Sequence, residues 1–298
     1  MTVDRAKIEQ IVQVLKNLAE PTRLRLVTLL GHGELTVGEI CRVVGLSQPR
    51  VSRHLRLLTE AGLLDRVREQ QRVYYRTPAA RPRAGWLNGL LAAVDPEDPT
   101  LQRDRVRVAV VVGEREKLAA HELGAPADRD QVGLAAVLRE ELGPVALGEL
   151  LDIGTGAGRL VEMLGGQATY AVGVDLSLPA LRLARARLHG RALVHCEFRH
   201  CDMYALTYAV ESFDTVTIDR VLARAERPVA VLTEAARVLR HSGRLLLVER
   251  FGELEACMGL DPLLGVRQWL DASGFKLTRL RRCDLASDHY LLALAQRS

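Results

Sequence analysis

Aromatic residues, cysteine and long apolar runs are all scarce in this sequence of 298 residues. No apolar run approaches the roughly 20 residues that a membrane-spanning helix needs, and the N-terminus lacks the short apolar core of a secretory signal. The composition, 48% hydrophobic and 26% charged, is that of ordinary globular proteins and excludes a disordered or fibrous chain. These features predict a cytoplasmic protein with room for two domains.

The five cysteines are odd in number, scattered, and never spaced as C-x-x-C; they are Cys41, Cys196, Cys201, Cys257 and Cys283. This distribution suits reduced thiols in a reducing compartment better than a disulfide framework. Four possible metal ligands cluster around an expected strand: His195, Cys196, His200 and Cys201. Alternation along a strand points His195 and Cys196 to opposite faces. We therefore expect no metal site at this cluster.

Positive charge is concentrated at the N-terminal end of the chain. Residues 1–83 hold 15 Lys and Arg against 8 Asp and Glu, a net charge of +7, whereas the whole chain carries +4 and the remainder therefore −3. Clustered positive charge is the footprint of a polyanionic partner, although a modest excess also serves solubility alone. The residue pattern inside this basic segment has to decide between the two.

Apolar residues recur at helical spacing through the basic segment. Helices are expected over residues 8–18, 24–30, 36–44 and 47–60. Gly45 and Leu46 form a tight turn, Ser47 stands at a capping position, and Pro49 fits a first helical turn, where its missing N–H costs nothing. This punctuation is typical of a helix-turn-helix. Two alternating segments follow at 63–68 and 72–77 around a polar turn, which predicts a β-hairpin wing.

The stretches Glu34–Ile40 and Gly45–Leu55 resemble the winged helix-turn-helix of the ArsR/SmtB family of bacterial repressors, over roughly residues 5–80. The resemblance implies a homodimer whose second helix enters the major groove of an operator while the wing grips phosphates. The residues expected near base edges are Gln48, Arg50, Ser52 and His54, with Ser47 at the helix start. Those expected near phosphates are Arg53, Arg56, Arg68 and Arg72. A solvated surface position is the competing interpretation for each arginine.

In the resembled family, the first helix and the helix after the wing build the dimer interface. The candidates here are Ile11, Leu15, Trp86, Leu87 and Leu90, and packing within one subunit is an equally open interpretation. The family's thiolate site would need cysteines where this chain has Thr36 and Gly38, and residues 84–95 contain no His for the family's other metal site. We therefore predict no metal site in this domain, so a regulatory signal has to enter elsewhere.

Residues 149–158 form an apolar strand that runs into three alternating glycines. Such a turn exposes unpaired backbone N–H groups at a helix start and favours a nucleotide-type ligand. A dinucleotide loop would read G-x-G-x-x-G, but Arg159 stands where its last glycine belongs, so NAD is the weaker alternative. Strands are expected at 150–153, 170–174, 193–198, 213–218 and 244–248, with helices between them. This alternation predicts a doubly wound, Rossmann-like α/β domain.

Four features in order resemble class I S-adenosylmethionine-dependent methyltransferases: Asp152 with the glycine turn, Asp175 after the second strand, Asp202–Met203 after the third, and the segments 212–216 and 234–248. The resemblance implies that Asp175 accepts the ribose hydroxyls, that Asp202 and Met203 hold the adenine, and that Asp152 orients the turn and reaches the ligand's amino group. The expected cofactor is S-adenosylmethionine or S-adenosylhomocysteine. Its expected contacts are Asp152, Gly154, Thr155, Gly156, Gly158, Asp175, Leu176, Asp202, Met203 and Asp219.

The sequence thus predicts an α/β protein overall, with a winged helix-turn-helix at 1–83, a dimerisation helix and linker at 84–100, and a methyltransferase-like domain at 101–298. No catalytic residue is identifiable, because no group of residues is marked as a base and its orienter. The resemblance also implies aromatic residues in the helices before the glycine turn, as a lid over the cofactor; residues 104–146 contain none, which counts against catalysis. Asp219, Arg220 and Glu249 are candidates for acceptor contacts, with a salt-bridged strand rim as the favoured alternative.

Three functional hypotheses remain open. The first is a transcriptional regulator, a repressor, with the cofactor as its effector. The second is a regulator that also methylates a small molecule. The third is a DNA-binding protein with a degenerate domain that serves only dimerisation, which the intact glycines and acids count against.

Overall fold

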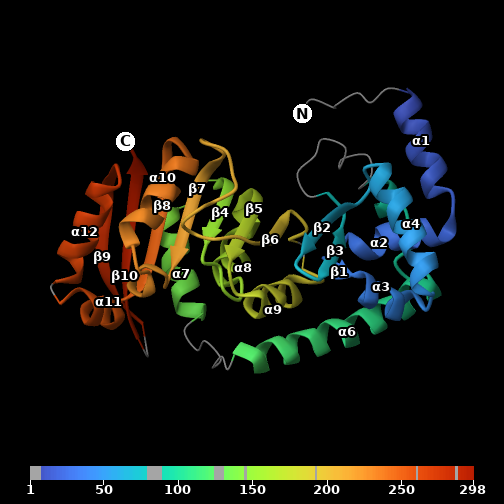
Figure 1. The fold of residues 1–298 in the computed structure, drawn as a ribbon, viewed down its shortest axis with the longest axis horizontal. Coiled ribbons are helices and arrows are strands. Elements are labelled where there is room, and N and C mark those ends of the chain that lie inside the picture. Colours follow the sequence, from blue (N-terminus) through green and yellow to red (C-terminus); the bar gives the residue numbers. More distant parts are fainter. Residues whose placement is uncertain are drawn as a thin grey trace. The chain divides into compact units, whose positions relative to one another are not determined.

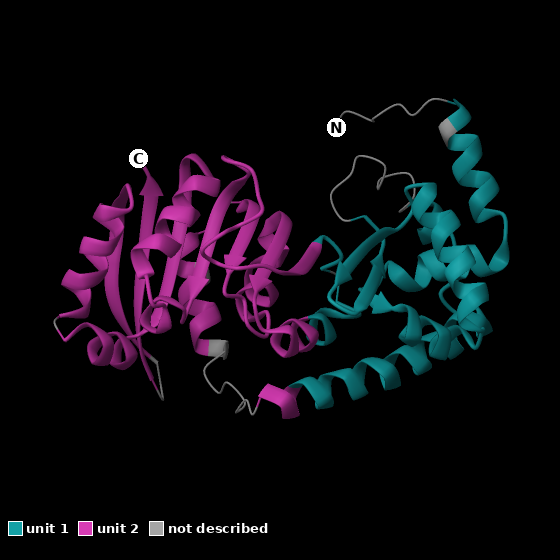
Figure 2. Ribbon diagram, in the orientation of Figure 1, with its two compact units in different colours: residues 1–119, 185–195 teal, residues 120–184, 196–298 magenta. Residues whose placement is uncertain are grey.

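The computed structural model describes residues 8–78, 89–123, 131–143, 146–191, 193–259, 261–285 and 288–298. The chain divides into two compact units, coloured separately in Figure 2. The first comprises residues 1–119 and 185–195, and the second comprises residues 120–184 and 196–298. Within the described ranges, no helix combines the length and apolar character that a membrane span requires.

Four short helices form the start of the first unit: α1 Ile8–Leu18, α2 Pro21–Leu30, α3 Val37–Val44 and α4 Gln48–Glu60 (Figure 1). A capping box begins α3, in which Glu39 N donates to the Thr36 hydroxyl and Thr36 N donates to the Glu39 carboxylate. Gly45 ends α3 in the left-handed conformation, with φ of +70°, as a tight turn requires. The predicted helix-turn-helix is confirmed.

The predicted wing is also confirmed. Its strands are β2 Asp65–Glu69 and β3 Arg72–Arg76, and the short β1 Leu35–Thr36 completes a sheet of order β1-β3-β2. All its strand pairs are antiparallel, and Tyr74 is buried under the hairpin. The hairpin is therefore anchored to the helical core through β1 and through Tyr75, which belongs to that core.

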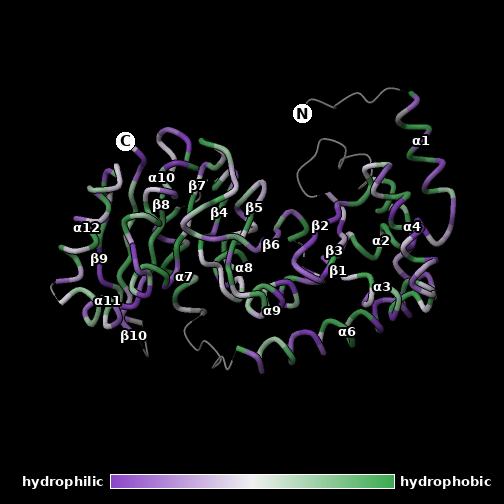
Figure 3. Tube along the Cα trace, in the orientation of Figure 1, coloured by the Kyte–Doolittle hydropathy of each residue, from purple (hydrophilic) through white to green (hydrophobic). Residues whose placement is uncertain are grey.

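The long helix α6, Pro99–Leu123, belongs to the first unit through Ala119. Hydrophilic and hydrophobic turns alternate along it in Figure 3. Val108, Val111 and Val112 join the apolar core of the first unit. The Asp104 carboxylate pairs with both Nε and Nη2 of Arg25 on α2. The first unit therefore extends beyond the linker expected at 84–100.

The second unit is built on one sheet, of order β6-β5-β4-β7-β8-β10-β9 in the described part of the chain. The strands are β4 Gly148–Ile153, β5 Ala168–Asp175, β6 Cys196–His200, β7 Phe213–Asp219, β8 Leu239–Arg250, β9 Phe275–Leu285 and β10 Asp288–Arg297. The strands from β4 to β8 are parallel, and β10 runs antiparallel to both of its neighbours. The predicted doubly wound α/β fold is confirmed.

Helices and short turns connect these strands. They are α7 Gln131–Leu142, α8 Arg159–Leu164, η1 Gly165–Gln167, α9 Leu178–Leu188, η2 Leu222–Arg224, α10 Pro228–Val238, α11 Phe251–Met258 and α12 Pro262–Ala272. The third strand, β6, begins at Cys196 rather than at residue 193, and His195 lies in the preceding turn. The elements after residue 250, for which the sequence analysis predicted nothing, complete the sheet with an antiparallel pair.

Gly158 lies at a position where any larger residue would clash with its neighbours, whereas Gly252 does not. Gly158 has φ of +79°, and a Cβ there would lie 2.8 Å from Phe198 and 2.9 Å from Ala184. We expect Gly158→Ala to lower the free energy of unfolding by about 2 kcal/mol, because it adds backbone strain to a clash. Gly252→Ala is the control, since a Cβ at this position in α11 meets nothing within 4 Å. Urea denaturation measures both, and equal stabilities would contradict this packing.

Candidate functional site

The glycine turn between β4 and α8 leaves one side of its backbone open. Gly154, Gly156 and Gly158 all have positive φ, of +68°, +54° and +79°. A Cβ on Gly154 would overlap Val221, whereas a Cβ on Gly156 would meet nothing within 4 Å. The turn is therefore packed at its two ends and open at its middle glycine, so a ligand can approach the backbone there.

Asp175 ends β5 beside this turn. Its Oδ2 accepts a hydrogen bond from Gly156 N at 2.8 Å, and its Oδ1 accepts one from Ser177 N at 2.7 Å. Thr155 N also donates to Val174 O at 2.9 Å, which fixes the turn against β5. Because each carboxylate oxygen has two lone pairs, Asp175 keeps capacity for a hydroxyl-bearing ligand. Leu176, the next predicted contact, is 55% exposed.

The predicted pair Asp202 and Met203 lies at the neighbouring strand end. Asp175 is aligned with His200 in the β5–β6 register, and Cys201 N donates to Asp175 O at 3.2 Å. Asp202 is half-buried and accepts from Tyr204 N at 2.9 Å, while Met203 packs partly into the core. The structure thus brings Asp175, Asp202 and the glycine turn to one edge of the sheet, where ligands of doubly wound folds bind.

Asp152 is buried inside the sheet instead of lining its edge. Its Oδ1 accepts from the Thr217 hydroxyl on β7 at 2.6 Å. Burial raises the pKa of this carboxyl to about 7. Within the described residues, Oδ2 is buried without a hydrogen-bond partner. An unpartnered buried oxygen next to the open turn fits a ligand that brings a donor, such as an amine.

Asp219, the last of the predicted cofactor contacts, forms a buried ion pair with Arg159. Its Oδ2 accepts from Nε of Arg159 at 2.9 Å and its Oδ1 from Nη2, and the two side chains are only 8% and 4% exposed. Nε of Arg220 lies 3.4 Å from the same Oδ1. Arg159, the first residue of α8, is thereby tied to the end of β7. The sequence pattern around Arg159 argued against a dinucleotide loop but gave no sign of this pairing, whose partners lie 60 residues apart.

Glu249 lies near the end of β8, next to β7. Its Oε1 accepts from Val221 N at 2.9 Å and from Leu222 N at 2.6 Å, and the side chain is fully buried. Burial, assisted by the negative charge of Asp219, raises the pKa of this carboxyl to about 7. Arg220, which follows Asp219 in the chain, has φ of +57°, a strained conformation for a non-glycine residue.

The residues predicted to bind DNA are mostly exposed. Ser47 occupies the N-cap position of α4 without a side-chain hydrogen bond to the helix. The exposed residues of the predicted set are Ser47, Gln48, Arg50, Ser52, Arg53 and Arg56 around α4, and Arg68 and Arg72 on the wing. Within the described residues, Arg50, Arg53 and Arg72 pair with no carboxylate. Their charges are therefore available to a polyanion.

His54 differs from the rest of that set. Its side chain is 17% exposed, and Nδ1 lies 3.6 Å from a carboxylate oxygen of Glu20, the N-cap residue of α2. Its predicted base contact would require the ring to leave this position. The exposed apolar residues of α1 include the predicted interface candidates Ile11 and Leu15, while Leu90 packs on the core. Trp86 and Leu87 lie outside the described residues.

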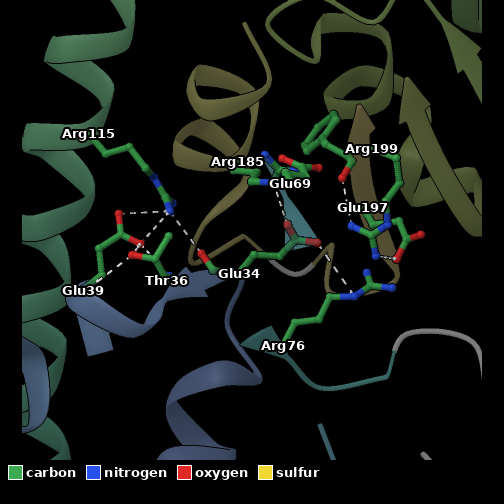
Figure 4. A network of polar contacts seen from close by, with 10 residues as sticks. Glu34, Thr36, Glu39, Glu69, Arg76, Arg115, Arg185, Glu197 and Arg199 are labelled. Carbon is green, nitrogen blue, oxygen red and sulfur yellow. Dashed lines mark hydrogen bonds and ion pairs between the residues drawn. The ribbon is translucent and has the colours of Figure 1, made fainter. Parts of the chain in front are cut away.

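A buried ion-pair cluster, which the sequence analysis missed, connects the wing with the end of α9 inside the first unit (Figure 4). Nε of Arg185 lies 2.6 Å from Glu34 Oε2, and Nη2 lies 2.5 Å from Glu69 Oε1. The guanidinium also stacks 4.2 Å above the ring of Tyr74. Burial opposes the charge, but the two carboxylates outweigh it and raise the pKa of Arg185. Its side chain is 1% exposed, so this cation is held entirely by protein groups.

A second buried arginine joins α6 to α3 in the same view. Nη1 of Arg115 donates to the Glu34 carbonyl at 3.2 Å and lies 3.3 Å from the Glu39 carboxylate (Figure 4). Glu39 is the capping-box residue of α3. In the described part of the chain, no three His, Cys, Asp or Glu side chains are grouped to hold a metal ion.

Glu249 generates a pH prediction. Folded Glu249 keeps its proton up to about pH 7, whereas the ordinary value is 4.5, so the folded state binds more protons between these values. Its contribution to stability therefore falls as pH rises through this window, by at most about 3 kcal/mol. Glu249→Gln, which keeps the acceptor, should lose this decline between pH 5 and 8 in urea denaturation. The exposed Glu255→Gln in α11 is the control, and parallel profiles for wild type and Glu249→Gln would disprove the assignment.

The comparisons with known proteins match two separate parts of the chain. The model of the arsR family of bacterial regulatory proteins matches residues 20–66, and that of a methyltransferase domain matches residues 151–247. The arsenic resistance transcriptional regulator ArsR1 of Pseudomonas putida is 42% identical over 104 residues, which are 34% of this chain and 79% of that regulator.

Relatives of the second part are enzymes by name. The demethylmenaquinone methyltransferase of Clavibacter sepedonicus is 35% identical over 120 residues, 40% of this chain, and the chain spans about half (48%) of that enzyme's length. A chain from the solved complex of the Haloferax volcanii Trm112 methyltransferase activator with a methyltransferase is 20% identical, with a TM-score of 0.50 over 62% of this chain and 96% of that one. This likeness supports the fold alone. The chain belongs to the arsR family of bacterial regulatory proteins, and it carries a methyltransferase domain after the family's winged helix-turn-helix.

Proposed function

We propose that this DNA-binding regulator is a repressor and that its methyltransferase domain binds S-adenosylmethionine or S-adenosylhomocysteine as an effector. The observation that carries the proposal is the open turn at Gly156, hydrogen-bonded to Asp175. The helix that follows Asp175, α9, ends in residues that belong to the DNA-binding unit. The ligand site and the DNA-binding surface are therefore linked through one helix.

DNA binding is supported by the exposed cations of α4 and the wing. Arg50 and Arg53 lie on the exposed side of α4, whose opposite side is buried through Val51, Leu55 and Leu58. An operator of two half-sites fits a homodimer, and the exposed apolar residues of α1 support a dimer interface. A protein with this role would act in the cytoplasm, with the bacterial chromosome.

Binding of the cofactor is supported by three separate features. The turn is open at Gly156, the acids Asp175 and Asp202 stand at adjacent strand ends, and Asp152 keeps an unpartnered buried oxygen. These groups fit the hydroxyls, the adenine amine and the ammonium of such a ligand. When bound, the methionine form supplies a methyl group, and the homocysteine form supplies none.

Coupling is proposed to run through α9. Ser177 N is bound by Asp175, and the Ser177 hydroxyl accepts from Ala180 N in the first turn of α9. At the other end of the helix, Arg185 binds Glu69 at the tip of β2. A ligand that favours one position of Asp175 would thus bias the wing. Tenfold differential affinity, or about 1.4 kcal/mol, gives a measurable switch.

A bifunctional protein that also methylates a small molecule is the second candidate. Glu249 favours it, because a buried carboxyl with a pKa of about 7 is suited to general-base chemistry at neutral pH. Its unpartnered Oε2 is the atom that would take a proton. Release of S-adenosylhomocysteine from S-adenosylmethionine in the presence of candidate acceptors would identify this activity.

Asp175 should control the effector response. A duplex that the protein selects from a random-sequence pool serves as the operator, and its affinity is titrated without ligand and with each cofactor. We expect Asp175→Ala to abolish a response that is about tenfold in the wild type, since the ligand loses its hydroxyl acceptor, and to keep ligand-free operator affinity within about twofold. Calorimetry measures the loss of cofactor binding directly.

The control variant is Asp271→Ala, which removes an exposed carboxylate from α12 in the same unit. Its response should equal that of the wild type. An unchanged response in Asp175→Ala would refute the effector site. A wild-type operator affinity that neither cofactor alters would refute the effector role while leaving the DNA-binding role intact.

Arg50 should contribute to sequence recognition. If its exposed guanidinium contacts a base edge in two hydrogen bonds, Arg50→Ala weakens operator binding by about 1–3 kcal/mol and binding to random DNA much less. Arg103→Ala on α6 is the control for the loss of one exposed positive charge. Fluorescence titrations with both duplexes at fixed salt measure the two affinities. Equal losses on both duplexes would assign Arg50 to phosphates instead.

A further inference from the structure

The first unit contains a cavity of about 400 Å³ between α2, α6 and the turn that follows α9. We propose that this cavity binds a small amphipathic monocarboxylate, that is, an apolar body with one carboxylate group. The site is separate from the glycine turn and goes beyond the proposed effector function. Its volume lies within the range of about 300–1,000 Å³ that is usual for small-molecule sites.

The walls of the cavity are apolar. Leu29 on α2 faces Leu101, Val108 and Val112 on α6, and the two valines are 7% and 8% exposed. Since apolar surface in a cavity gains free energy when a ligand removes it from water, the body of the ligand has to be apolar. An aromatic ring system of two fused rings is small enough for this volume.

The polar groups of the cavity favour an anion. The only carboxylate among its lining residues, Asp104, is neutralised by the two-point contact with Arg25. Arg105 also lines the cavity, and within the described residues it has no carboxylate partner. The cavity therefore presents an uncompensated guanidinium beside apolar walls, which complements a carboxylate attached to an apolar body.

Two imidazoles also line the cavity, and their charge state is consistent with an anionic ligand. Burial lowers the pKa of His189 to about 3, assisted by the positive charge of Arg115, and burial and Arg105 lower the pKa of His32. Both rings are thus neutral at pH 7 and carry no charge that would compete with Arg105. Gly190 N donates to His32 O at 2.9 Å, so the turn after α9 is fixed against the end of α2.

The cavity also lies among the contacts that position the DNA-binding helices. Arg25 and Asp104 hold α6 to α2 next to it, and Arg107 Nη1 donates to Val43 O at the end of α3 at 3.0 Å. A ligand wedged between α2 and α6 would act on both of these contacts. The cavity is thus placed to sense a second small molecule within the DNA-binding unit itself.

Calorimetry on the full chain tests the site with 1-naphthoate as the probe. Its uncharged amide, 1-naphthamide, and acetate separate the contributions of charge and apolar body. We expect naphthoate to bind, naphthamide to bind at least about fivefold more weakly, and acetate not to bind. Absence of naphthoate binding, or equal binding of the amide, would overturn the proposal.

Variants at exposed positions of α6, inside and outside the lining, locate the site. Ala109→Trp fills the cavity from an exposed position and should reduce naphthoate affinity by more than about tenfold, whereas Val110→Trp, one residue along and outside the lining, should leave it unchanged. Arg105→Gln should weaken naphthoate about fivefold and naphthamide not at all, with Arg103→Gln as control. Circular dichroism verifies folding of each variant.

Binding that survives in Ala109→Trp would place the ligand elsewhere and overturn the assignment. The Asp175→Ala variant distinguishes this site from the proposed effector site, because naphthoate should bind it with wild-type affinity. Loss of naphthoate binding in Asp175→Ala would assign the probe to the glycine turn and equally overturn the proposal.

Discussion

The buried guanidinium of Arg185 is the constraint on which the first unit depends. It lies between the carboxylates of Glu34 and Glu69 and over Tyr74, at 1% exposure. Removal of one partner from such a cluster leaves an uncompensated buried charge, which costs about 3–5 kcal/mol. Water cannot reach the buried guanidinium to replace a lost partner. The cluster therefore holds together three segments of the first unit: strand β2, the residues before β1 and the last turn of α9. Arg115 extends the same arrangement to α6 and α3 through Glu34 and Glu39.

This constraint gives the proposed coupling its physical basis. A continuous helix transmits a displacement at its first turn to its last turn because its backbone hydrogen bonds resist bending. Asp175 binds Ser177 at the start of α9, and Arg185 near the end of α9 is fixed to Glu69. In the proposed regulator, operator binding would therefore also change cofactor affinity, and by the same factor, since coupling free energies are reciprocal.

The sequence predicted what local patterns encode. Helical spacing, the turn at Gly45 and the glycine turn revealed the winged helix and the parallel strands, because each depends on residues close together in the chain. It did not reveal the pairs Arg185–Glu34 and Arg159–Asp219, since partners 151 and 60 residues apart leave no local pattern. The antiparallel pair β9–β10 was missed, although the partial alternation of apolar and polar residues in β9 and the apolar run 290–295 in β10 were available. His54 lay on the expected helix, but its contact with Glu20 depends on tertiary packing.

In the second unit, the carboxylates that are not occupied by an ion pair are the ones that can contact a ligand. Asp219 would be the natural contact for a ligand at the end of β7, but its carboxylate is occupied by Arg159 and approached by Arg220. This ion pair fixes the glycine turn before any ligand arrives, which favours binding because less order is lost. Asp152 and Glu249 each keep one buried oxygen without a hydrogen-bond partner among the described residues. In the proposed regulator, Asp175 and Asp202 at the adjacent strand ends remain to contact the ligand, at a turn that is already in place.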